Sequence, residues 1–313
     1  MSNPLQEMLR CQGVVILDGG LATSLEERGH KLDSHLWSTR VLLDAPKEIE
    51  TVHRLFIEAG ADCITTASYQ ASYEGLSHAG HDAAFVDELL IRSVTLARDA
   101  VDGFWSDIDS PAGRLRPLVA ASVGPYGAHL ADGSEYVGGY GITHQELVAF
   151  HKRRFRILAM SEADLVVCET IPSLAEVKAL VSLFDQTPDV WGWISFSCRD
   201  GSHLNDGTPV EVAVDLCEHV EGLVGVGVNC TAPKFVNKLI HRIQMRTDRS
   251  IIVYPNIGGS WNAEKKEWVG EDLGEYWVEM AETWYESGAQ VVGGCCRIGP
   301  DLIGHVRRKI VQT

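Results

Sequence analysis

Short apolar runs rich in β-branched residues recur eight times along the chain, and a longer amphipathic segment follows most of them. The runs are VVIL (14–17), DCITT (62–66), PLVAAS (117–122), DLVVC (164–168), WGWISFS (191–197), LVGVGVN (223–229), IIVYP (251–255) and QVVGG (290–294). Continuous apolar runs of this length are typical of strands that are buried on both faces of a parallel sheet. The pattern therefore predicts eight buried parallel strands.

Helical periodicity fills the intervals between these runs. Apolar residues recur every three or four positions in PKEIETVHRLFIEAG (46–60), ELVAFHKRRFRILAMSEA (146–163) and SLAEVKALVSLF (173–184). The glycines in EAGAD (58–62) and ESGAQ (286–290) are typical of helix ends that come just before a strand. A strand that alternates with a helix in this way predicts right-handed βαβ units and a parallel sheet.

Eight such units in 313 residues favour the α/β class and a (β/α)8 TIM-type barrel. An open doubly wound sheet is the alternative, and it would more readily carry a glycine-rich phosphate turn after an early strand. The sequence DGGLATSLEERG (18–29) does not match the GxGxxG pattern of such a turn. No Pro/Gly-rich linker or shift in composition divides the chain, so we expect one domain over residues 1–313.

Composition and charge narrow the possible partners. Hydrophobic residues make up 45% of the chain, and 43 acidic against 27 basic residues give a formal net charge of −16. Binders of nucleic-acid backbones need clustered Lys and Arg, so we expect neither a nucleic acid nor a membrane partner. The start, MSNPLQEMLRCQG, lacks the pattern of a secretory signal, and no apolar stretch approaches the roughly 20 residues of a membrane span. These features predict a cytoplasmic protein.

Polar and thiol side chains stand directly after several of the predicted strands. In (β/α)8 barrels the carboxyl ends of the strands meet at one rim, where the active site lies. The residues at these ends include Asp18-Gly19-Gly20, Glu169-Thr170, Asn229-Cys230 and Cys295-Cys296. Three cysteines, Cys230, Cys295 and Cys296, are therefore expected to lie on one rim although they are far apart in sequence.

The adjacent cysteines allow several interpretations. Cys63, Cys168 and Cys198 lie in or beside strands and are expected to be small core residues. A disulfide between adjacent residues is strained, and a redox dithiol would more typically read Cys-x-x-Cys. Three thiolates on one rim suit Zn²⁺, with a fourth position left open. A pair of buried core thiols at Cys295 and Cys296 remains an alternative.

Each polar strand-end residue also has a structural interpretation. Asp18 could cap a helix that begins near Leu21, and Glu169 could favour the dipole of a helix that begins near Pro172. Asn229 could satisfy backbone groups at the end of a strand. However, a carboxylate inside a barrel mouth is costly unless it is paired, which favours ligand binding for both acidic residues.

Ordered sequence blocks from about residue 13 to residue 305 suggest a known family. They are LDGGLATSLEERG (17–29), TTASYQAS (65–72), ASVGPYGAHLADGSEYVGGY (121–140), CETIPSLAE (168–176), SFSCRDGSHLNDGTP (195–209), GVGVNC (225–230), VYPNIGG (253–259) and GGCCRIGP (293–300). With these blocks the chain resembles the homocysteine S-methyltransferase family. The long segment after the third strand resembles the branch of the family that uses S-methylmethionine.

The resemblance implies a zinc-bearing (β/α)8 barrel and a set of site residues. The implied zinc ligands, which would act in catalysis through the metal, are Cys230, Cys295 and Cys296. The residues implied around the amino-acid head of homocysteine are Asp18, Gly19, Gly20, Glu169 and Asn229. The two glycines would permit close backbone approach.

The implied reaction transfers a methyl group from a sulfonium donor, S-methylmethionine, to the thiol of homocysteine and gives methionine. The alternatives are S-adenosylmethionine or betaine as the donor, and selenocysteine as the acceptor. An interpretation of another class is a non-catalytic zinc or redox-sensing barrel. Asp132 and Glu135 are expected on a solvated loop, and Arg297 is a candidate to balance the charge of the thiolates.

Overall fold

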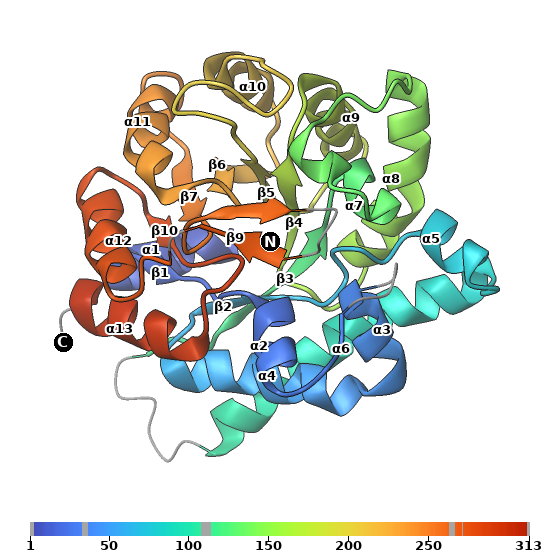
Figure 1. The fold of residues 1–313 in the computed structure, drawn as a ribbon, viewed down its shortest axis with the longest axis horizontal. Coiled ribbons are helices and arrows are strands. Elements are labelled where there is room, and N and C mark those ends of the chain that lie inside the picture. Colours follow the sequence, from blue (N-terminus) through green and yellow to red (C-terminus); the bar gives the residue numbers. More distant parts are fainter. Residues whose placement is uncertain (1–2, 33–36, 108–113, 263–266, 271, 312–313) are drawn as a thin grey trace.

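The computed structural model describes residues 3–32, 37–107, 114–262, 267–270 and 272–311, and its centre is a ring of eight parallel strands (Figure 1). In ring order the strands are β1 (Val15–Ile16), β10 (Val291–Val292), β7 (Ser250–Tyr254), β6 (Leu223–Asn229), β5 (Gly192–Phe196), β4 (Leu165–Ile171), β3 (Leu118–Val123) and β2 (Cys63–Thr65). The Asp62 N–H donates to Ile16 O (2.7 Å) and the Asp18 N–H to Cys63 O (3.1 Å), which joins β2 to β1. The predicted (β/α)8 barrel is confirmed.

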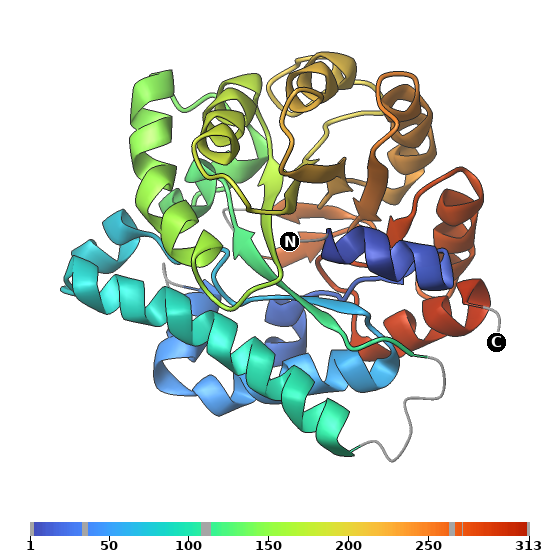
Figure 2. The same ribbon diagram turned by 180° about the vertical axis from the view of Figure 1, so that it is seen from behind.

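Helices surround the strands (Figures 1 and 2). They are α1 (Pro4–Gln12), α2 (Leu21–Glu27), α3 (Trp37–Asp44), α4 (Pro46–Ala59), α5 (Tyr73–His78), α6 (Ala83–Asp107), α7 (Tyr126–Leu130), α8 (His144–Ala159), α9 (Leu174–Asp185), α10 (Val210–Cys217), α11 (Pro233–Gln244), α12 (Tyr276–Glu286) and α13 (Pro300–Ile310). A short 3-10 helix, η1 (Ser134–Tyr136), follows α7, and a hairpin of β8 (Ser260–Asn262) and β9 (Glu267–Val269) follows β7. Among the described residues, no helix has the length and low polarity that crossing a membrane requires.

Local sequence signals account for several helix ends. A capping box at Thr143 and Glu146 starts α8, because each side chain accepts a hydrogen bond from the backbone of the other. Gly60 (φ +120°) and Gly288 (φ +105°) follow α4 and α12 in backbone conformations that side chains disfavour. The predicted glycine stops are therefore confirmed.

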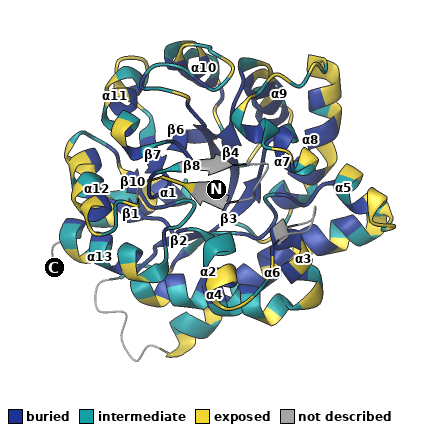
Figure 3. Ribbon diagram, in the orientation of Figure 1, coloured by how far each residue is buried: buried dark blue, intermediate teal, exposed yellow. Residues whose placement is uncertain are grey.

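The apolar core has two layers, and Figure 3 shows that the central strands are mostly buried. One layer fills the space between the strands and the surrounding helices, and the other fills the interior of the barrel. Leu5 and Met8 of α1 pack into the interior layer against residues such as Leu17 and Trp193. Figure 2 shows α1 in front of the strands, on the side opposite to the β8–β9 hairpin. The interior core thus leaves the other end of the barrel free for polar groups.

A buried ion-pair network ties the first strands to the last helix. The side chain of Asp62 is fully buried and accepts hydrogen bonds from Gln12 Nε2 (2.8 Å) and the Ile16 N–H (3.1 Å). The same carboxylate pairs with Arg307 Nη1 (2.7 Å) and lies 3.6 Å from Arg114 Nε. The negative charge of Asp62 therefore compensates the positive charges of two largely buried guanidinium groups near the junction of β1 and β2.

We expect Asp62→Asn to lower the free energy of unfolding by about 3 kcal/mol, because it leaves largely buried guanidinium charge without its carboxylate. Asp102→Asn is the matched control: it breaks only the exposed pair with Arg116, which should cost less than about 1 kcal/mol. Urea denaturation of the two variants and the parent chain measures both losses. Equal losses would contradict the structural role of Asp62.

Candidate metal and substrate site

Three cysteine side chains meet at the carboxyl ends of β6 and β10. The Sγ atom of Cys230 lies 3.0 Å from that of Cys295 and 3.5 Å from that of Cys296, and the latter two are 3.9 Å apart. Cys230 is buried and the adjacent pair is partly exposed. The predicted convergence is therefore present, and Cys63, Cys168 and Cys198 are buried away from it as expected.

Strand β7 lies between β6 and β10 in the ring and connects the two cysteine segments. Its last residue, Tyr254, accepts a hydrogen bond from the Cys230 N–H (3.3 Å), and Pro255 O accepts one from the Cys295 N–H (2.9 Å). Cys230 has a φ of +47°, a left-handed conformation that costs a non-glycine residue about 1–3 kcal/mol. This left-handed conformation turns the backbone out of the sheet at the end of β6.

Gly19 and Gly20 pack against the turn that carries the cysteine pair. The Gly20 N–H donates to Ile298 O (2.8 Å), and a Cβ atom on Gly20 would lie 2.8 Å from Cys295 O. A Cβ atom on Gly19 would collide with Ile298 O. These two glycines therefore let the backbone pack closely against the turn that carries the cysteine pair. Both residues also line the cavity described below.

The three thiols suit a zinc ion by donor type and spacing. Three sulfur ligands at about 2.3 Å from a tetrahedral zinc lie about 3.8 Å from one another. Two of the three Sγ separations, 3.5 and 3.9 Å, lie close to this value, and the third, between Cys230 and Cys295, is shorter at 3.0 Å. Thiol donation from Cys295 and Cys296 also lowers the pKa of Cys230 well below its ordinary value. The cluster is thus a candidate metal site.

Asp18 lies beside the cysteines and is almost fully buried, with 3% of its surface exposed. Its Oδ2 accepts hydrogen bonds from the Thr65 N–H (2.8 Å) and from Thr65 Oγ1 (3.0 Å). Its pKa is raised to about 8, mainly by burial and to a lesser extent by the nearby charge of Glu169, and the hydrogen bonds from Thr65 oppose this shift. The N-cap of α2 is Gly20, and no side chain caps that helix, so the capping interpretation of Asp18 is wrong.

Glu169 lies within β4, which extends past the predicted end at residue 168. The pairing of β4 with β5 shifts in register between Cys168 and Ile171, and Thr170 has a φ of +61°. Burial raises the pKa of Glu169 to about 7, although hydrogen bonds from Ser122 and Tyr254 oppose this shift. Because α9 begins at Leu174, Glu169 is not in a first helical turn, and the helix-dipole interpretation is wrong.

Asn229 is fully buried and holds the distorted end of β4. Its Oδ1 accepts hydrogen bonds from the Thr170 N–H (2.7 Å) and from Ser195 Oγ (2.9 Å), and its Nδ2 donates to Thr170 Oγ1 (2.8 Å). These contacts stabilise a β-branched residue in a left-handed conformation that it rarely adopts. Asn229 is not among the residues that line the cavity, and it supports the site through Thr170, which does line it.

A cavity of about 120 Å³ joins these groups. The ionisable groups that line it are three thiols and four carboxylates: Cys230, Cys295, Cys296, Asp18, Glu26, Glu135 and Glu169. No Lys or Arg is among the lining residues that the structure describes. Tyr69, Tyr136 and Tyr254 supply aromatic surface. Such a cavity should attract a metal cation and cationic ligands.

Two expectations for loop residues are wrong. Glu135 is 7% exposed and lines the cavity, whereas Asp132 is exposed as expected. Next to Glu135, the Tyr136 hydroxyl lies 3.4 Å from Cys230 Sγ. The guanidinium of Arg297 pairs instead with Asp272, and Arg297 is not among the residues that line the cavity. The position of Thr65 at the end of a strand is a sequence signal for its contact with Asp18. The sequence offers no comparable signal for Glu135 or Tyr136.

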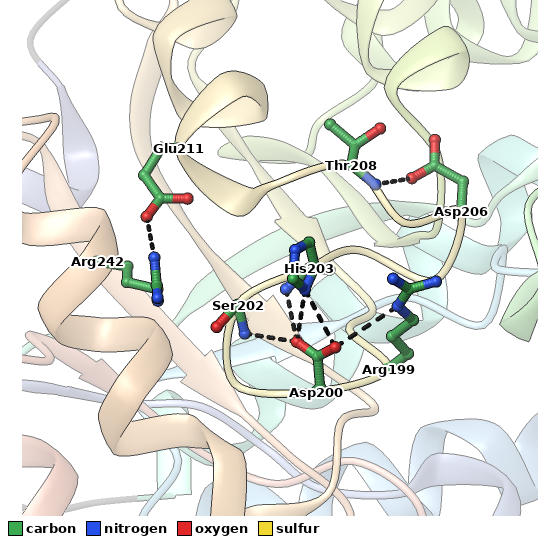
Figure 4. A network of polar contacts seen from close by, with 8 residues as sticks. All are labelled: Arg199, Asp200, Ser202, His203, Asp206, Thr208, Glu211 and Arg242. Atoms are coloured by element: carbon green, nitrogen blue, oxygen red, sulfur yellow. Dashed lines mark hydrogen bonds and ion pairs between the residues drawn. The ribbon is translucent and has the colours of Figure 1, made fainter.

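The loop after β5 is held by its own polar side chains (Figure 4). The carboxylate of Asp200 accepts hydrogen bonds from the Ser202 N–H (2.7 Å) and the His203 N–H (2.9 Å). Asp206 accepts one from the Thr208 N–H (2.8 Å), and Figure 4 shows the Glu211–Arg242 pair nearby. None of these residues lines the cavity, and their contacts with one another shape the loop.

Comparisons with known proteins agree with this geometry. The profile of the family described as homocysteine S-methyltransferase matches residues 15–310. Homocysteine S-methyltransferase YbgG of Bacillus subtilis (strain 168) is 42% identical over 304 residues, which are 97% of this chain and 96% of that protein. Selenocysteine Se-methyltransferase of Brassica oleracea var. italica is 42% identical over 320 residues, covering 98% and 92% of the two chains.

A solved structure supports the same assignment. The metallated form of the homocysteine methyltransferase MmuM from Escherichia coli has a TM-score of 0.87 and 38% identity to this chain. The match covers 98% of this chain and 100% of that one. The family profile matches nearly the whole length of this chain, so the chain belongs to the homocysteine S-methyltransferase family.

Proposed function

We propose that the chain transfers a methyl group from a sulfonium donor, S-methylmethionine, to the thiol of homocysteine in a zinc-dependent reaction. The observation that carries this proposal is one cavity that holds three clustered thiols beside two buried carboxylates. The thiols fit a metal that binds sulfur, and the carboxylates fit the ammonium group of an amino acid. Together they match a substrate that is both a thiol and an amino acid.

The metal-binding residues in this proposal are Cys230, Cys295 and Cys296. Their sulfur chemistry and spacing favour zinc over metals that prefer oxygen ligands. Bound zinc would supply Lewis-acid chemistry that makes a thiol acidic enough to be a nucleophile at neutral pH. A metallated form of a relative that is 38% identical supports a metal here.

The amino-acid head of homocysteine is assigned to Asp18 and Glu169. Each carboxyl has a raised pKa because burial disfavours its charge, and their mutual repulsion adds to the shift of Asp18. An ammonium group between them would offset both effects. Thr65 and Ser122 fix the two carboxyls through hydrogen bonds, so the head would be held in one orientation. Asn229 would preserve that geometry through Thr170.

The donor chemistry requires little from the protein beyond positioning. The bond between the methyl carbon and the donor sulfur breaks, and its electron pair stays on that sulfur, which becomes a neutral thioether. A new bond joins the methyl carbon to the homocysteine sulfur, whose proton has gone to solvent. No general acid is needed for such a leaving group, so alignment of the two sulfurs and the methyl carbon is the main contribution.

The alternative of a non-catalytic zinc or redox-sensing barrel explains less. A sensor needs accessible thiols but has no use for two carboxyls that are costly to bury. Selenocysteine remains a second acceptor to test, because a relative named for that activity is 42% identical to the chain. Its selenol would occupy the place of the homocysteine thiol.

The test is a methyl-transfer assay with homocysteine or selenocysteine as the acceptor. The donor panel is S-methylmethionine, S-adenosylmethionine and betaine, each with and without a chelator. The proposal expects the fastest production of methionine from S-methylmethionine and homocysteine, and loss of that activity with the chelator. Transfer from none of the donors would overturn it.

We expect Cys230→Ser to lose stoichiometric zinc and to reduce methyl transfer to background, because a hydroxyl is a poor replacement for a thiolate ligand. Cys11→Ser is the matched control, since Cys11 is exposed and lies in α1. Elemental analysis and the assay above measure both effects. Full zinc and full activity in Cys230→Ser would refute the metal assignment.

Asp18→Asn should raise the KM for homocysteine by about 10- to 100-fold, because it removes a charged hydrogen-bond partner worth about 1.5–3 kcal/mol. The KM for the donor should change much less. Steady-state kinetics with each substrate varied in turn separates the two constants. An unchanged homocysteine KM would return Asp18 to a structural role.

The same variant should be more stable than the parent chain at high pH. Folded Asp18, with a pKa of about 8, keeps its proton between pH 4 and 8, whereas the unfolded carboxyl with a pKa near 3.8 has lost it. The parent therefore loses about 1.4 kcal/mol of stability per pH unit as the pH rises through this window. Asn has no such dependence, so its advantage should grow by up to about 4 kcal/mol between pH 5 and pH 8.

Urea denaturation of both metal-free chains at pH 5 and pH 8 measures this difference. Because metal is absent from both samples, loss of zinc at low pH cannot contribute. A stability difference that does not change with pH would contradict the raised pKa of Asp18.

A further inference from the structure

Glu135 is a buried carboxylate whose position the homocysteine site does not explain. It lies in η1, is 7% exposed and lines the cavity. Its Oε2 atom is buried and has no hydrogen-bond partner. A buried carboxylate oxygen without a donor is costly, so such an oxygen in a cavity indicates a missing cationic partner.

The backbone around Glu135 is held firmly in place. Gly127 of α7 packs directly against the backbone of Ser134 and Glu135, where a Cβ atom would collide. Ser197 Oγ, at the end of β5, lies 3.5 Å from Glu135 O. The backbone that carries the Glu135 side chain is therefore in place before any ligand binds.

Glu135 lines the same cavity as the three cysteines and as the side chains of Tyr69 and Tyr136. Tyr136, the next residue, places its hydroxyl 3.4 Å from Cys230 Sγ. Glu135 thus faces the part of the cavity where the thiols and two tyrosine rings meet.

The chemistry of this corner fits a sulfonium ion. A sulfonium has a permanent positive charge and no N–H groups, so it is stabilised by a carboxylate and by aromatic faces without directed hydrogen bonds. An ammonium group would need several acceptors, and Asp18 and Glu169 already provide acceptors in the same cavity. No basic side chain among the described lining residues competes for Glu135.

We propose that Glu135, with the rings of Tyr69 and Tyr136, forms the subsite that binds the sulfonium group of the methyl donor. This inference rests on the proposed function and assigns its donor specificity to named residues. It places the donor's methyl group on the side of the cavity that holds the cysteine cluster.

The charge on the donor sulfur disappears as its methyl group leaves. The attraction to Glu135 is therefore strongest for the bound donor and weaker in the transition state. An interaction of this kind lowers the KM for the donor without raising kcat. It also discriminates against a neutral thioether in the same place, which helps the product to leave.

The test compares Glu135→Gln with Asp132→Asn in the zinc-loaded enzyme. Both variants remove one negative charge from the same loop, but Asp132 is exposed and does not line the cavity. The KM for S-methylmethionine is measured at saturating homocysteine, and the KM for homocysteine at saturating donor. The inhibition constant of methionine against the donor, at saturating homocysteine, reports on a neutral thioether in the donor site.

For Glu135→Gln we expect the KM for S-methylmethionine to rise by about tenfold or more, with kcat equal to or above that of the parent. The KM for homocysteine, the methionine inhibition constant and the zinc content should stay within about twofold. Asp132→Asn should resemble the parent in every constant. Glu135→Asp, which keeps the charge, should fall between the parent and Glu135→Gln in donor KM.

Two results would overturn the inference. An unchanged donor KM in Glu135→Gln would show that the carboxylate does not bind the donor. An equal weakening of methionine and S-methylmethionine would assign Glu135 to the ammonium group and not to the sulfonium. In either case the proposed function still holds if the parent enzyme transfers methyl groups. If the parent enzyme is inactive with every donor, the proposed function itself is refuted.

Discussion

Parallel pairing of β7 with β6 on one side and β10 on the other is the interaction on which the site depends. Tyr254 and Pro255, at the end of β7, accept backbone hydrogen bonds from Cys230 and Cys295. These two bonds bring together thiols from distant parts of the chain. Gly19 and Gly20 complete the arrangement, because only residues without a side chain let the turn after β1 lie against Ile298. The contacts that close the barrel therefore also assemble the site.

The site gathers groups that repel one another when ionised. Three thiols and four carboxylates line one small cavity, and burial raises the pKa of Asp18 to about 8 and of Glu169 to about 7. Left-handed backbone at Thr170 and Cys230 adds strain. The stability lost here is supplied elsewhere, for example by the interior core and the Asp62 network. In the proposed function, a metal ion, the ammonium group of homocysteine and the sulfonium group of the donor relieve the repulsion.

The barrel and its cysteine cluster were predictable because their signals are local. Continuous apolar runs mark the strands, and parallel topology brings whatever follows those strands to one rim, which placed Asp18, Glu169 and the three cysteines correctly. The burial of Glu135 was not predictable, because it arises from the packing of η1 against α7 and β4. Neither the contact of Tyr136 with Cys230 nor the pairing of Arg297 with Asp272 could be predicted from local sequence.

In the proposed function, methyl transfer depends on one zinc ion held by the thiol cluster. To test this dependence, metal is removed from the purified chain, and methyl transfer from S-methylmethionine to homocysteine is followed as zinc is added back. We expect no activity in the metal-free chain and a linear rise that stops at one zinc per chain. Full activity without metal, or a rise that does not saturate at one equivalent, would contradict it.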